Sequence, residues 1–276
     1  MSASCTGERH VADVPEMAAV TRVTDENKNV RIIYIDKKIE CAPGQFVMLW
    51  LPGLDEKPYS VFLSGRENAI LVRRKGKFTN ALFGLREGDK VGLRGPYGKG
   101  FETKGVKKPL LVAGGCGVAS LMMLAQHFSA RGKNKKPDFI FGVKTKNEIF
   151  CEGLLGKHTN LYITSDDGSA GERGFPTALA EKMLRAGKGG AYDMAYSCGP
   201  EKMMKGLQDV CERAGVNYEF SLERYFRCGF GVCGACEIDG MLVCKDGPVF
   251  TREQLKKMPS FGKASREKSG KEISLH

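Results

Sequence analysis

The 276-residue sequence has no apolar run close to the roughly 20 residues that a membrane-spanning helix needs. Its first ten residues, MSASCTGERH, are polar and lack the apolar core of a secretory signal peptide. Clustered arginines interleaved with aromatic residues, which are typical of a groove for single-stranded nucleic acid, are also missing. We therefore expect a soluble, cytoplasmic protein that binds neither membrane nor nucleic acid. In such a reducing compartment, the ten cysteines indicate thiol or metal chemistry rather than disulfides.

The net charge of +11 at pH 7 comes from basic residues spread along the chain. A solvated, lysine-rich surface accounts for this charge, and docking of an acidic protein or attraction of anionic cofactors is the alternative. With 42% hydrophobic residues, the chain is long enough for two domains with cores of their own. The polar, basic stretch 254–276 has little periodicity, which predicts a partly disordered tail.

Two patterns of secondary structure follow one another along the chain. Up to about residue 103, short β runs such as VRIIYI and GQFVMLWL alternate with turn residues, which predicts an antiparallel barrel or sandwich. The charged segment 102–109, ETKGVKKP, is the best candidate for a linker. From LLVAGG to PEKMMKGLQDVCERAG, strand and helix patterns alternate, which is typical of a parallel sheet with right-handed crossovers. The expected fold class is therefore α+β and multidomain.

Four cysteines lie close together in the segment RCGFGVCGACEIDGMLVC, at Cys228, Cys233, Cys236 and Cys244. The first three have the C-x4-C-x2-C spacing that holds a two-iron, two-sulfur (2Fe-2S) cluster in plant-type ferredoxins. The glycines between them let backbone amides approach the cluster sulfurs. Structural zinc is the main alternative, although zinc ligands usually come as two separated pairs. A thioredoxin-like dithiol at Cys233 and Cys236 is a further alternative.

Asp239 and Gly240 lie between apolar residues in this segment and predict a tight β-hairpin. A two-residue loop places Cys236 opposite Val243, whereas a three-residue loop places it opposite Cys244. The sequence fits both. Before the cysteines, Glu223 and Arg224 either link two domains or form a surface ion pair.

A glycine-rich turn joins the strand LLVA to the next helix, at Gly114, Gly115 and Gly117. A bare backbone in this position lets a pyrophosphate approach the positive end of the helix. Ser120 stands where the usual dinucleotide pattern has a third Gly or Ala, and such a turn can also serve only to pack strand against helix. Phosphate binding is the interpretation that the strand-turn-helix context favours.

Two further segments end strands at the same edge of the predicted sheet. Cys198, Gly199 and Pro200 run directly into a helix, so Cys198 either faces the reacting end of a dinucleotide or is an inert buried thiol. Asp166 and Asp167 follow another strand, where they accept from ribose hydroxyls or form an Asx turn. A carboxylate there repels a ribose phosphate and so favours NADH over NADPH.

In the first domain, the segment KPYS begins a strand and offers the Tyr59 ring and the Ser60 hydroxyl side by side. Downstream, Arg73 and the turn 76–79 offer a cation and backbone amides. An ordinary half-buried strand aromatic is the alternative for Tyr59.

Taken together, these segments resemble one group within the ferredoxin reductase superfamily. The matching segments, in order, are PGQFVML, KPYS, LVRRKGKFT, RGPYGKGF, VAGGCGVASL, TSDDGSAGERGF, YSCGPEKMM and the four cysteines followed by GPVF. They cover the whole chain except its two ends, and they are most similar to the electron-transfer subunits of NAD-dependent dihydroorotate dehydrogenases. Relatives of that group include subunits of hydrogenases, sulfide dehydrogenases and NADH-dependent ferredoxin:NADP oxidoreductases.

The resemblance implies cofactor contacts for named residues. Tyr59 would pack on the FAD ring and Ser60 would lie near its reactive nitrogen, while Lys57 replaces the family's Arg and loses its planar fork. The remaining FAD contacts would come from Pro58, Leu71, Val72, Arg73, Phe78 and Thr79, with Phe78 in place of a commoner Gly. The NAD contacts would come from Gly114, Gly115, Gly117, Asp166, Cys198, Gly199 and Pro200. The metal ligands would be Cys228, Cys233, Cys236 and Cys244.

The resemblance also implies four regions and a function. They are an FAD-binding barrel at 1–103, an NAD-binding α/β domain at 104–222, a 2Fe-2S domain at 223–250 and a basic tail at 251–276. NAD exchanges two electrons together and the cluster carries one, so FAD must stand between them. The expected partner is an FMN-containing catalytic subunit that oxidises dihydroorotate to orotate, so that electrons run toward NAD.

No side chain is expected to act as a catalytic acid, base or nucleophile. The alternative functions are a subunit of a related NAD(P)H-ferredoxin oxidoreductase, sulfide dehydrogenase or hydrogenase, and a zinc-stabilised nucleotide sensor without electron transfer.

Overall fold

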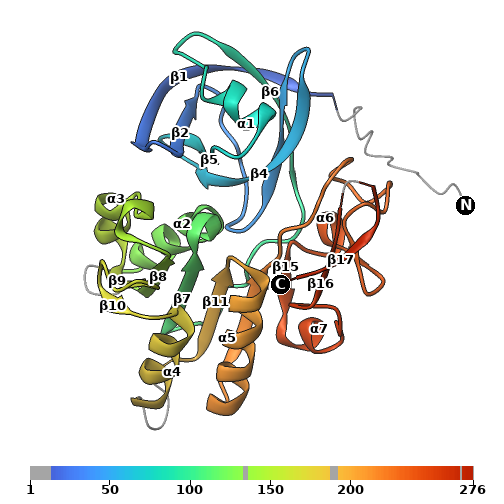
Figure 1. Cartoon of the computed structure of the whole chain (residues 1–276). Coiled ribbons are helices and arrows are strands. Elements are labelled where there is room, and N and C mark those ends of the chain that lie inside the picture. The colour runs from blue at the N-terminus through green and yellow to red at the C-terminus, as the bar shows by residue number, and fades with distance from the viewer. Residues whose placement is uncertain (1–13, 133–135, 187–191, 268, 276) are drawn as a thin grey trace, which may run out of the picture.

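The computed structural model describes residues 14–132, 136–186, 192–267 and 269–275 (Figure 1). The polar N-terminal segment on which the expectation of a cytoplasmic protein partly depends lies outside these residues. Within the described ranges, no helix is both long and apolar enough to cross a membrane.

The first part of the chain forms a closed antiparallel barrel, so the barrel rather than the sandwich is correct. Its strands run in the order β1-β2-β5-β4-β3-β6, and α1 follows β5. Their bounds are β1 Glu16–Asn27, β2 Val30–Ile35, β3 Phe46–Leu51, β4 Asp55–Leu63, β5 Asn68–Arg73, α1 Lys77–Leu82 and β6 Lys90–Tyr97. β-branched and aliphatic side chains such as Val47, Leu49, Val61 and Val91 are almost fully buried and form the interior.

The second part is a seven-stranded sheet in the order β10-β9-β8-β7-β11-β12-β15. All neighbours pair in parallel except β15, which is antiparallel to β12. The strands are β7 Pro109–Gly114, β8 Asp138–Val143, β9 Asn160–Ser165, β10 Glu172–Arg173, β11 Met194–Cys198, β12 Asn217–Ser221 and β15 Val249–Thr251. The predicted alternation of strands and helices is therefore confirmed.

Helices cover both faces of this sheet, because side chains along each strand alternate between the faces. Leu111 and Ala113 of β7 pack with α2 and α3, whereas Leu110 and Val112 pack with α4 and α5. The helices are α2 Val118–Ser129, α3 Glu152–His158, α4 Pro176–Ala186 and α5 Glu201–Ala214, and the 3-10 turns are η1 Gly115–Gly117 and η2 Lys146–Glu148.

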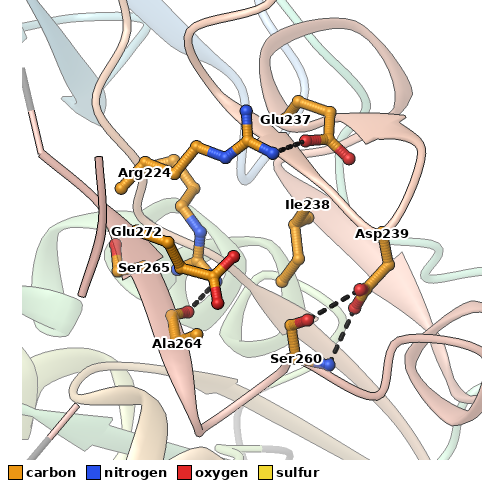
Figure 2. Close-up of a pocket in the computed structure, with 9 residues that line it drawn as sticks. Arg224, Glu237, Ile238, Asp239, Ser260, Ala264, Ser265 and Glu272 are labelled. Atoms are coloured by element: carbon orange, nitrogen blue, oxygen red, sulfur yellow. Dashed lines mark hydrogen bonds and ion pairs between the residues drawn. The ribbon is translucent and has the colours of Figure 1, made fainter. Parts of the chain in front are cut away.

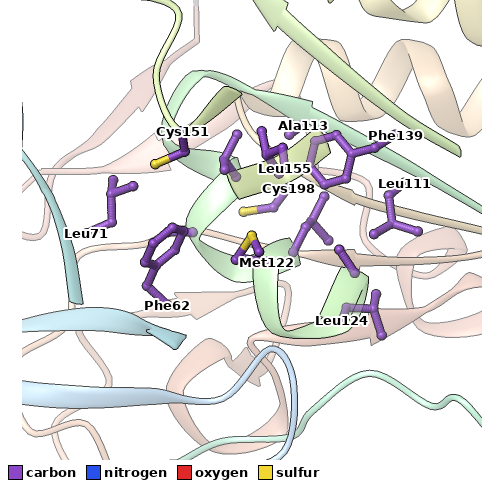
Figure 3. Packing of buried hydrophobic residues seen from close by; sticks show 14 of the residues in the cluster. Phe62, Leu71, Leu111, Ala113, Met122, Leu124, Phe139, Cys151, Leu155 and Cys198 are labelled. Atoms are coloured by element: carbon purple, nitrogen blue, oxygen red, sulfur yellow. The ribbon is translucent and has the colours of Figure 1, made fainter. Parts of the chain in front are cut away.

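One of the apolar clusters spans the barrel and the sheet. Figure 3 shows Phe62 and Leu71 of the barrel on one side of Met122 of α2, and Ala113 of the sheet on the other. Of the predicted linker 102–109, residues 102–108 have neither helix nor strand, and Pro109 begins β7. The linker is held to the sheet because the Tyr196 hydroxyl donates to the Glu102 carbonyl at 2.5 Å. The two parts are therefore packed together rather than joined by a loose tether.

The cysteine segment begins and ends on the sheet. It leaves the end of β12 and returns as β15, which pairs with β12. Between them lie the hairpin β13 (Glu237–Ile238) and β14 (Met241–Leu242) and the short helix α6 (Val243–Asp246).

The expectation of a partly disordered tail from residue 254 onward differs from the structure. The segment contains α7 (Arg252–Lys256) and the hairpin β16 (Ala264–Arg266) and β17 (Glu272–Ser274). Leu255, Met258 and Phe261 are 2%, 4% and 1% exposed, and the Phe261 ring lies 6.4 Å from that of Phe220 in β12. These three apolar side chains anchor the segment on the sheet because they bury their surface there.

Candidate functional site

The glycine turn after β7 and the Cys-Gly-Pro turn after β11 interlock at the carboxyl edge of the sheet. A Cβ atom on Gly117 would lie 1.9 Å from the carbonyl oxygen of Cys198. A Cβ atom on Gly114 would lie 2.6 Å from Cδ of Pro200, and one on Gly199 would lie 2.8 Å from the Gly114 amide nitrogen. Only glycine permits these contacts, so the two predicted NAD segments form one continuous backbone surface.

Gly115 and Arg73 bring the barrel to this surface. Gly115 has a φ of +50°, and a Cβ atom there would lie 3.4 Å from Nη1 of Arg73. Arg73 also faces Glu148 of η2 at 3.6 Å. A guanidinium therefore lies beside the turn that was predicted to hold a pyrophosphate, where a cation stabilises an anionic ligand.

A chain of three side chains joins the predicted FAD segment to the predicted nicotinamide segment. Ser60 of β4 and Ser120 of α2 lie 2.7 Å apart at their hydroxyl oxygens. The Cys198 thiol donates to the Ser120 hydroxyl at 3.4 Å. Ser120, which departs from the usual dinucleotide pattern, is thus the residue that connects the two segments. The sequence shows Ser120 in place of the usual Gly or Ala, but it did not predict that this side chain contacts Ser60 and Cys198.

The thiols at this edge are not activated. Burial raises the pKa of Cys116 to about 11, and burial together with the nearby Glu223 carboxylate raises the pKa of Cys198 to about 12. Burial also raises the pKa of Tyr59, whose ring stacks with Phe78 at 6.5 Å. All three groups stay protonated at neutral pH. Protonated thiols are poor nucleophiles, and the expectation that no side chain of the chain acts as one stays a prediction.

Glu223 is a further residue of this edge that the sequence left without a role there. Its side chain is exposed, yet desolvation by the surrounding protein raises its pKa. It also raises the pKa values of both Cys116 and Cys198, so it lies near both thiols. Its place two residues after the end of β12, whose Ser221 pairs with Cys198, is the signal that could have revealed it.

The other predicted FAD residues differ in their exposure and in their contacts. Lys57 lies at the surface of β4 and pairs with Asp55 at 2.5 Å. Thr79 caps its own helix, because its hydroxyl accepts from the amides of Lys75 and Gly76. Pro58 is half-buried, whereas the side chains of Leu71, Val72 and Phe78 are buried in the protein. Leu71, Val72 and Phe78 are 4%, 0% and 8% exposed as whole residues, so the contacts with FAD predicted for them stay predictions.

The two aspartates after β9 differ in their surroundings. The Asp167 carboxylate accepts from the amide and the hydroxyl of Ser169, at 2.9 and 2.6 Å, which is the predicted Asx turn. Asp166 is exposed beside it, and its amide donates to the Val143 carbonyl at 3.1 Å. The ribose contact predicted for Asp166 stays a prediction.

The hairpin after Cys236 has a two-residue loop. Glu237 pairs with Leu242 and Ile238 with Met241, which leaves Asp239 and Gly240 as the turn. Cys236 consequently lies opposite Val243, whose amide donates to its carbonyl at 3.4 Å. Of the two loop lengths that the sequence allowed, the structure has the shorter one.

The helix α6 that follows brings Cys244 back to Cys236, because the Cys244 amide donates to the Cys236 sulfur at 3.4 Å. Hydrogen bonding between these two thiols lowers the pKa of Cys236 to about 7. The Cys233 thiol helps to lower the pKa of Cys228, so these two side chains also lie close together. The closest neighbours among the four thiols are thus Cys228 with Cys233 and Cys236 with Cys244, and all four cysteines are free.

Backbone amides point at the first sulfur of the segment. The Val232 amide donates to the Cys228 sulfur at 3.4 Å. Burial opposes ionisation of this thiol, but the amides of Cys233, Val232 and Phe230 outweigh it and lower the pKa of Cys228 to about 6. Amides directed at a sulfur stabilise a thiolate, which is the form that binds metal.

Two thiol pairs fit two iron ions better than one zinc ion. Across the described residues, no three His, Cys, Asp or Glu side chains converge closely enough to hold a single metal ion. A 2Fe-2S cluster needs two thiolates on each iron, whereas structural zinc needs four ligands around one point.

Arg224 joins the cysteine segment to the NAD domain. Its guanidinium pairs with Glu201 at the start of α5, and the two side chains are only 4% and 7% exposed. It also donates to the Ala264 carbonyl at 3.3 Å. Figure 2 shows it beside a small pocket between β13 and the C-terminal segment, where Asp239 also accepts from Ser260. Of the two alternatives for Glu223 and Arg224, the domain link is correct for Arg224 and the surface ion pair is wrong.

Two protein-family models match the chain. The iron-sulfur cluster binding domain of dihydroorotate dehydrogenase B matches residues 223–256, and the oxidoreductase NAD-binding domain matches residues 111–209. The cysteine segment thus lies in a region that matches an iron-sulfur domain family, and the interlocked turns lie in one that matches an NAD-binding domain family.

Curated relatives match over nearly their full length. The chain is 41% identical over 261 residues to a probable dihydroorotate dehydrogenase B (NAD(+)) electron transfer subunit of Methanocaldococcus jannaschii, covering 94% of this chain and 98% of that one. It is 44% identical over 246 residues to the protein of the same description from Pyrococcus furiosus, covering 88% and 93%.

A solved structure of an NADH-dependent reduced ferredoxin-NADP oxidoreductase, determined to study flavin-based electron bifurcation, superposes with a TM-score of 0.76 at 28% identity. It covers 89% of this chain and 93% of that one. The agreement of fold, site and relatives confirms the resemblance: this chain belongs to the family of dihydroorotate dehydrogenase B (NAD(+)) electron transfer subunits, which are oxidoreductase subunits with an iron-sulfur and an NAD-binding domain.

Proposed function

We propose that the chain binds FAD in the barrel next to the NAD site and carries electrons between NAD and a 2Fe-2S cluster. The observation that supports this most is the contact chain from Ser60 through Ser120 to Cys198. It brings the predicted flavin segment and the predicted nicotinamide segment within hydrogen-bonding range. Tyr59 and Arg73 flank this chain on the barrel side.

For FAD, the proposed contacts are the Tyr59 ring, the Ser60 hydroxyl, the Lys57 and Arg73 cations, and the residues Pro58, Leu71, Val72, Phe78 and Thr79. The interlocked turns would hold NAD through Gly114, Gly115, Gly117, Cys198, Gly199 and Pro200, with Asp166 on a ribose. Buried thiols with high pKa values can pack against a nicotinamide without attacking it. The proposed division of the chain at residues 103, 222 and 250 follows these sites.

For the cluster, we propose the pairs Cys228 with Cys233 and Cys236 with Cys244, each holding one iron. Bound together, the flavin and the cluster would convert between two-electron and one-electron transfer. The chain's own residues bind and orient these groups and exclude water. The raised pKa values of Cys116 and Cys198 at the proposed NAD surface support this division of labour.

The partner would be an FMN-containing catalytic subunit that oxidises dihydroorotate to orotate in pyrimidine biosynthesis, in a cytoplasmic hetero-oligomer. The curated relatives carry the description of a subunit of that enzyme, which supports the assignment. In this assembly electrons run from the partner through the cluster and FAD to NAD.

A second function has structural support. The similarity to the NADH-dependent ferredoxin-NADP oxidoreductase extends over most of both chains, so a bifurcating complex with a different large subunit is the alternative. Anaerobic affinity purification from the native source separates the two. Recovery of an FMN-bearing dihydroorotate dehydrogenase chain supports the proposal, and recovery of a large subunit rich in iron-sulfur clusters supports the alternative.

The same preparation tests the cofactors. We expect about one FAD, two iron and two acid-labile sulfide per chain. Zinc without sulfide would contradict the cluster, and absence of flavin after mild purification would contradict the FAD site.

A further inference from the structure

The cysteine loop packs directly on the outer wall of the barrel. Gly229 has a φ of +87°, and a Cβ atom there would lie 2.9 Å from Cγ of Met48 in β3. The Phe230 ring lies 6.4 Å from that of Tyr97 in β6, and the Phe226 ring lies 4.9 Å from that of Phe46 in β3. The loop is therefore seated on β3 and β6, although its two ends belong to the NAD sheet.

Arg94 of β6 lies at the centre of this contact. Its Nε and Nη2 atoms donate to the two Glu56 carboxylate oxygens at 2.7 and 2.5 Å, and its side chain is 9% exposed. Nη2 also donates to the Cys228 carbonyl at 3.1 Å, and Nη1 donates to the Tyr97 hydroxyl at 3.3 Å. One buried guanidinium thus binds a carboxylate of the barrel and the backbone of the first cysteine.

Glu56 lies directly before the proposed FAD residues on β4. In the barrel, Met48 of β3 pairs with Pro58 of β4 on one side and with Arg94 of β6 on the other. The strand that would carry the flavin and the loop that would carry the cluster therefore meet through Glu56, Arg94 and Met48. A forked, charge-assisted contact fixes orientation as well as distance.

We propose that Arg94 is a positioning residue for electron transfer, which holds the Cys228 end of the cluster loop at a fixed place relative to the flavin strand and keeps a positive charge beside the cluster. This inference rests on the proposed function. The step that it affects is the transfer of one electron, in which no bond forms or breaks. Reduction adds negative charge to the cluster, so a neighbouring cation favours the reduced state.

Replacement of Arg94 by Lys tests the positioning part. Lysine keeps the charge but cannot bind both carboxylate oxygens and the carbonyl together. The matched control is R31K: Arg31 also binds a carboxylate with two nitrogens, at Asp25, and a backbone carbonyl, at Phe83. That contact lies within the barrel domain, away from the cysteine segment.

Hydrogen exchange of the amides in residues 228–236 reports the position of the loop whether or not cofactors are bound. A charge-assisted hydrogen bond is worth about 1.5 to 3 kcal/mol, so we expect R94K to speed exchange in the loop roughly 10- to 150-fold. R31K should leave the loop unchanged. Equal exchange in R94K and wild type, or equal effects of R94K and R31K, would overturn the positioning role. If R94K does not fold, E56Q provides the same comparison.

The charge part is tested by the reduction potential of the cluster in R94K and R94Q. Only R94Q loses the cation, and we expect its cluster to be about tenfold harder to reduce, which is 59 mV for one electron. Identical potentials in the two variants would overturn this part. A wild-type chain without iron would refute the proposed function, while loop exchange would still decide the role of Arg94.

Discussion

We expect the Gly117→Ala substitution to force the two interlocked turns apart, because it adds one carbon atom where their backbones touch. Gly117 has helical backbone angles, φ −56° and ψ −20°, so alanine suits its conformation. The added Cβ atom, however, would lie 1.9 Å from the carbonyl oxygen and 2.3 Å from the carbonyl carbon of Cys198. Both atoms belong to the backbone and cannot rotate away, so one turn must move.

Overpacking of this kind costs about 1 to 3 kcal/mol. The shift occurs at the surface proposed to hold NAD. If the NADH-bound state is destabilised by these 1 to 3 kcal/mol relative to the free protein, the dissociation constant of NADH rises about 5- to 150-fold. The barrel lies outside the clash, so FAD content should stay unchanged.

The assay is NADH titration of the FAD-bound protein, with thermal unfolding in parallel. Gly156→Ala is the matched control, because Gly156 lies within α3 and a Cβ atom there has no heavy atom within 4 Å. That change should stabilise the fold by roughly 0.5 to 1 kcal/mol and leave NADH binding unaffected. An unchanged NADH affinity in G117A would refute the argument that the two turns form the NAD surface.

Three further predictions concern separate parts of the chain. C236S should leave FAD reduction by NADH intact while it abolishes transfer to the partner, and unchanged transfer in a dye-linked assay would contradict a serial path. S120A removes the hydroxyl between Ser60 and Cys198, a contact worth about 1 kcal/mol, so hydride exchange measured by stopped flow should slow about fivefold; an unchanged rate would argue that this contact has no part in aligning the rings. Burial raises the pKa of Glu219 to about 7, so the stability it contributes is full below pH 4.5 and lost as the pH rises through 7. E219Q should therefore unfold at higher denaturant than wild type at pH 8, by on the order of 2 kcal/mol, with no gain at pH 4.5, and equal curves at pH 8 would disprove it.

Local patterns were sufficient to predict an antiparallel β domain and the α/β sheet, but not to choose between a barrel and a sandwich. The period of apolar residues in VRIIYI or VASLMMLAQHFSA depends only on neighbours along the chain. The C-terminal segment was wrongly predicted as a partly disordered tail because Leu255, Met258 and Phe261 are few apolar residues within a polar, basic stretch. They are buried because β12 and α5 provide apolar surface far away in the sequence.

The site was predictable in its parts and not in its connections. The spacing of the glycines predicted the turns, and the spacing of the cysteines predicted the cluster loop, because both spacings are local features of the sequence. The contacts that join the parts link residues 60 with 120, 94 with 228 and 201 with 224. Such pairs depend on how the domains pack, and a single sequence carries no signal for them. The hairpin register was open for a related reason, since both loop lengths satisfied the local pattern.

The central claim is that electrons from NADH reach a sulfur-bound iron pair through a flavin in this one chain. Electron paramagnetic resonance of the anaerobically purified protein, frozen after mixing with NADH, measures it directly. The account predicts the signal of a one-electron-reduced two-iron centre when FAD is bound, and its loss when FAD is removed. Complete bleaching of the flavin by NADH without any iron signal, in protein that contains iron and sulfide, would contradict the account.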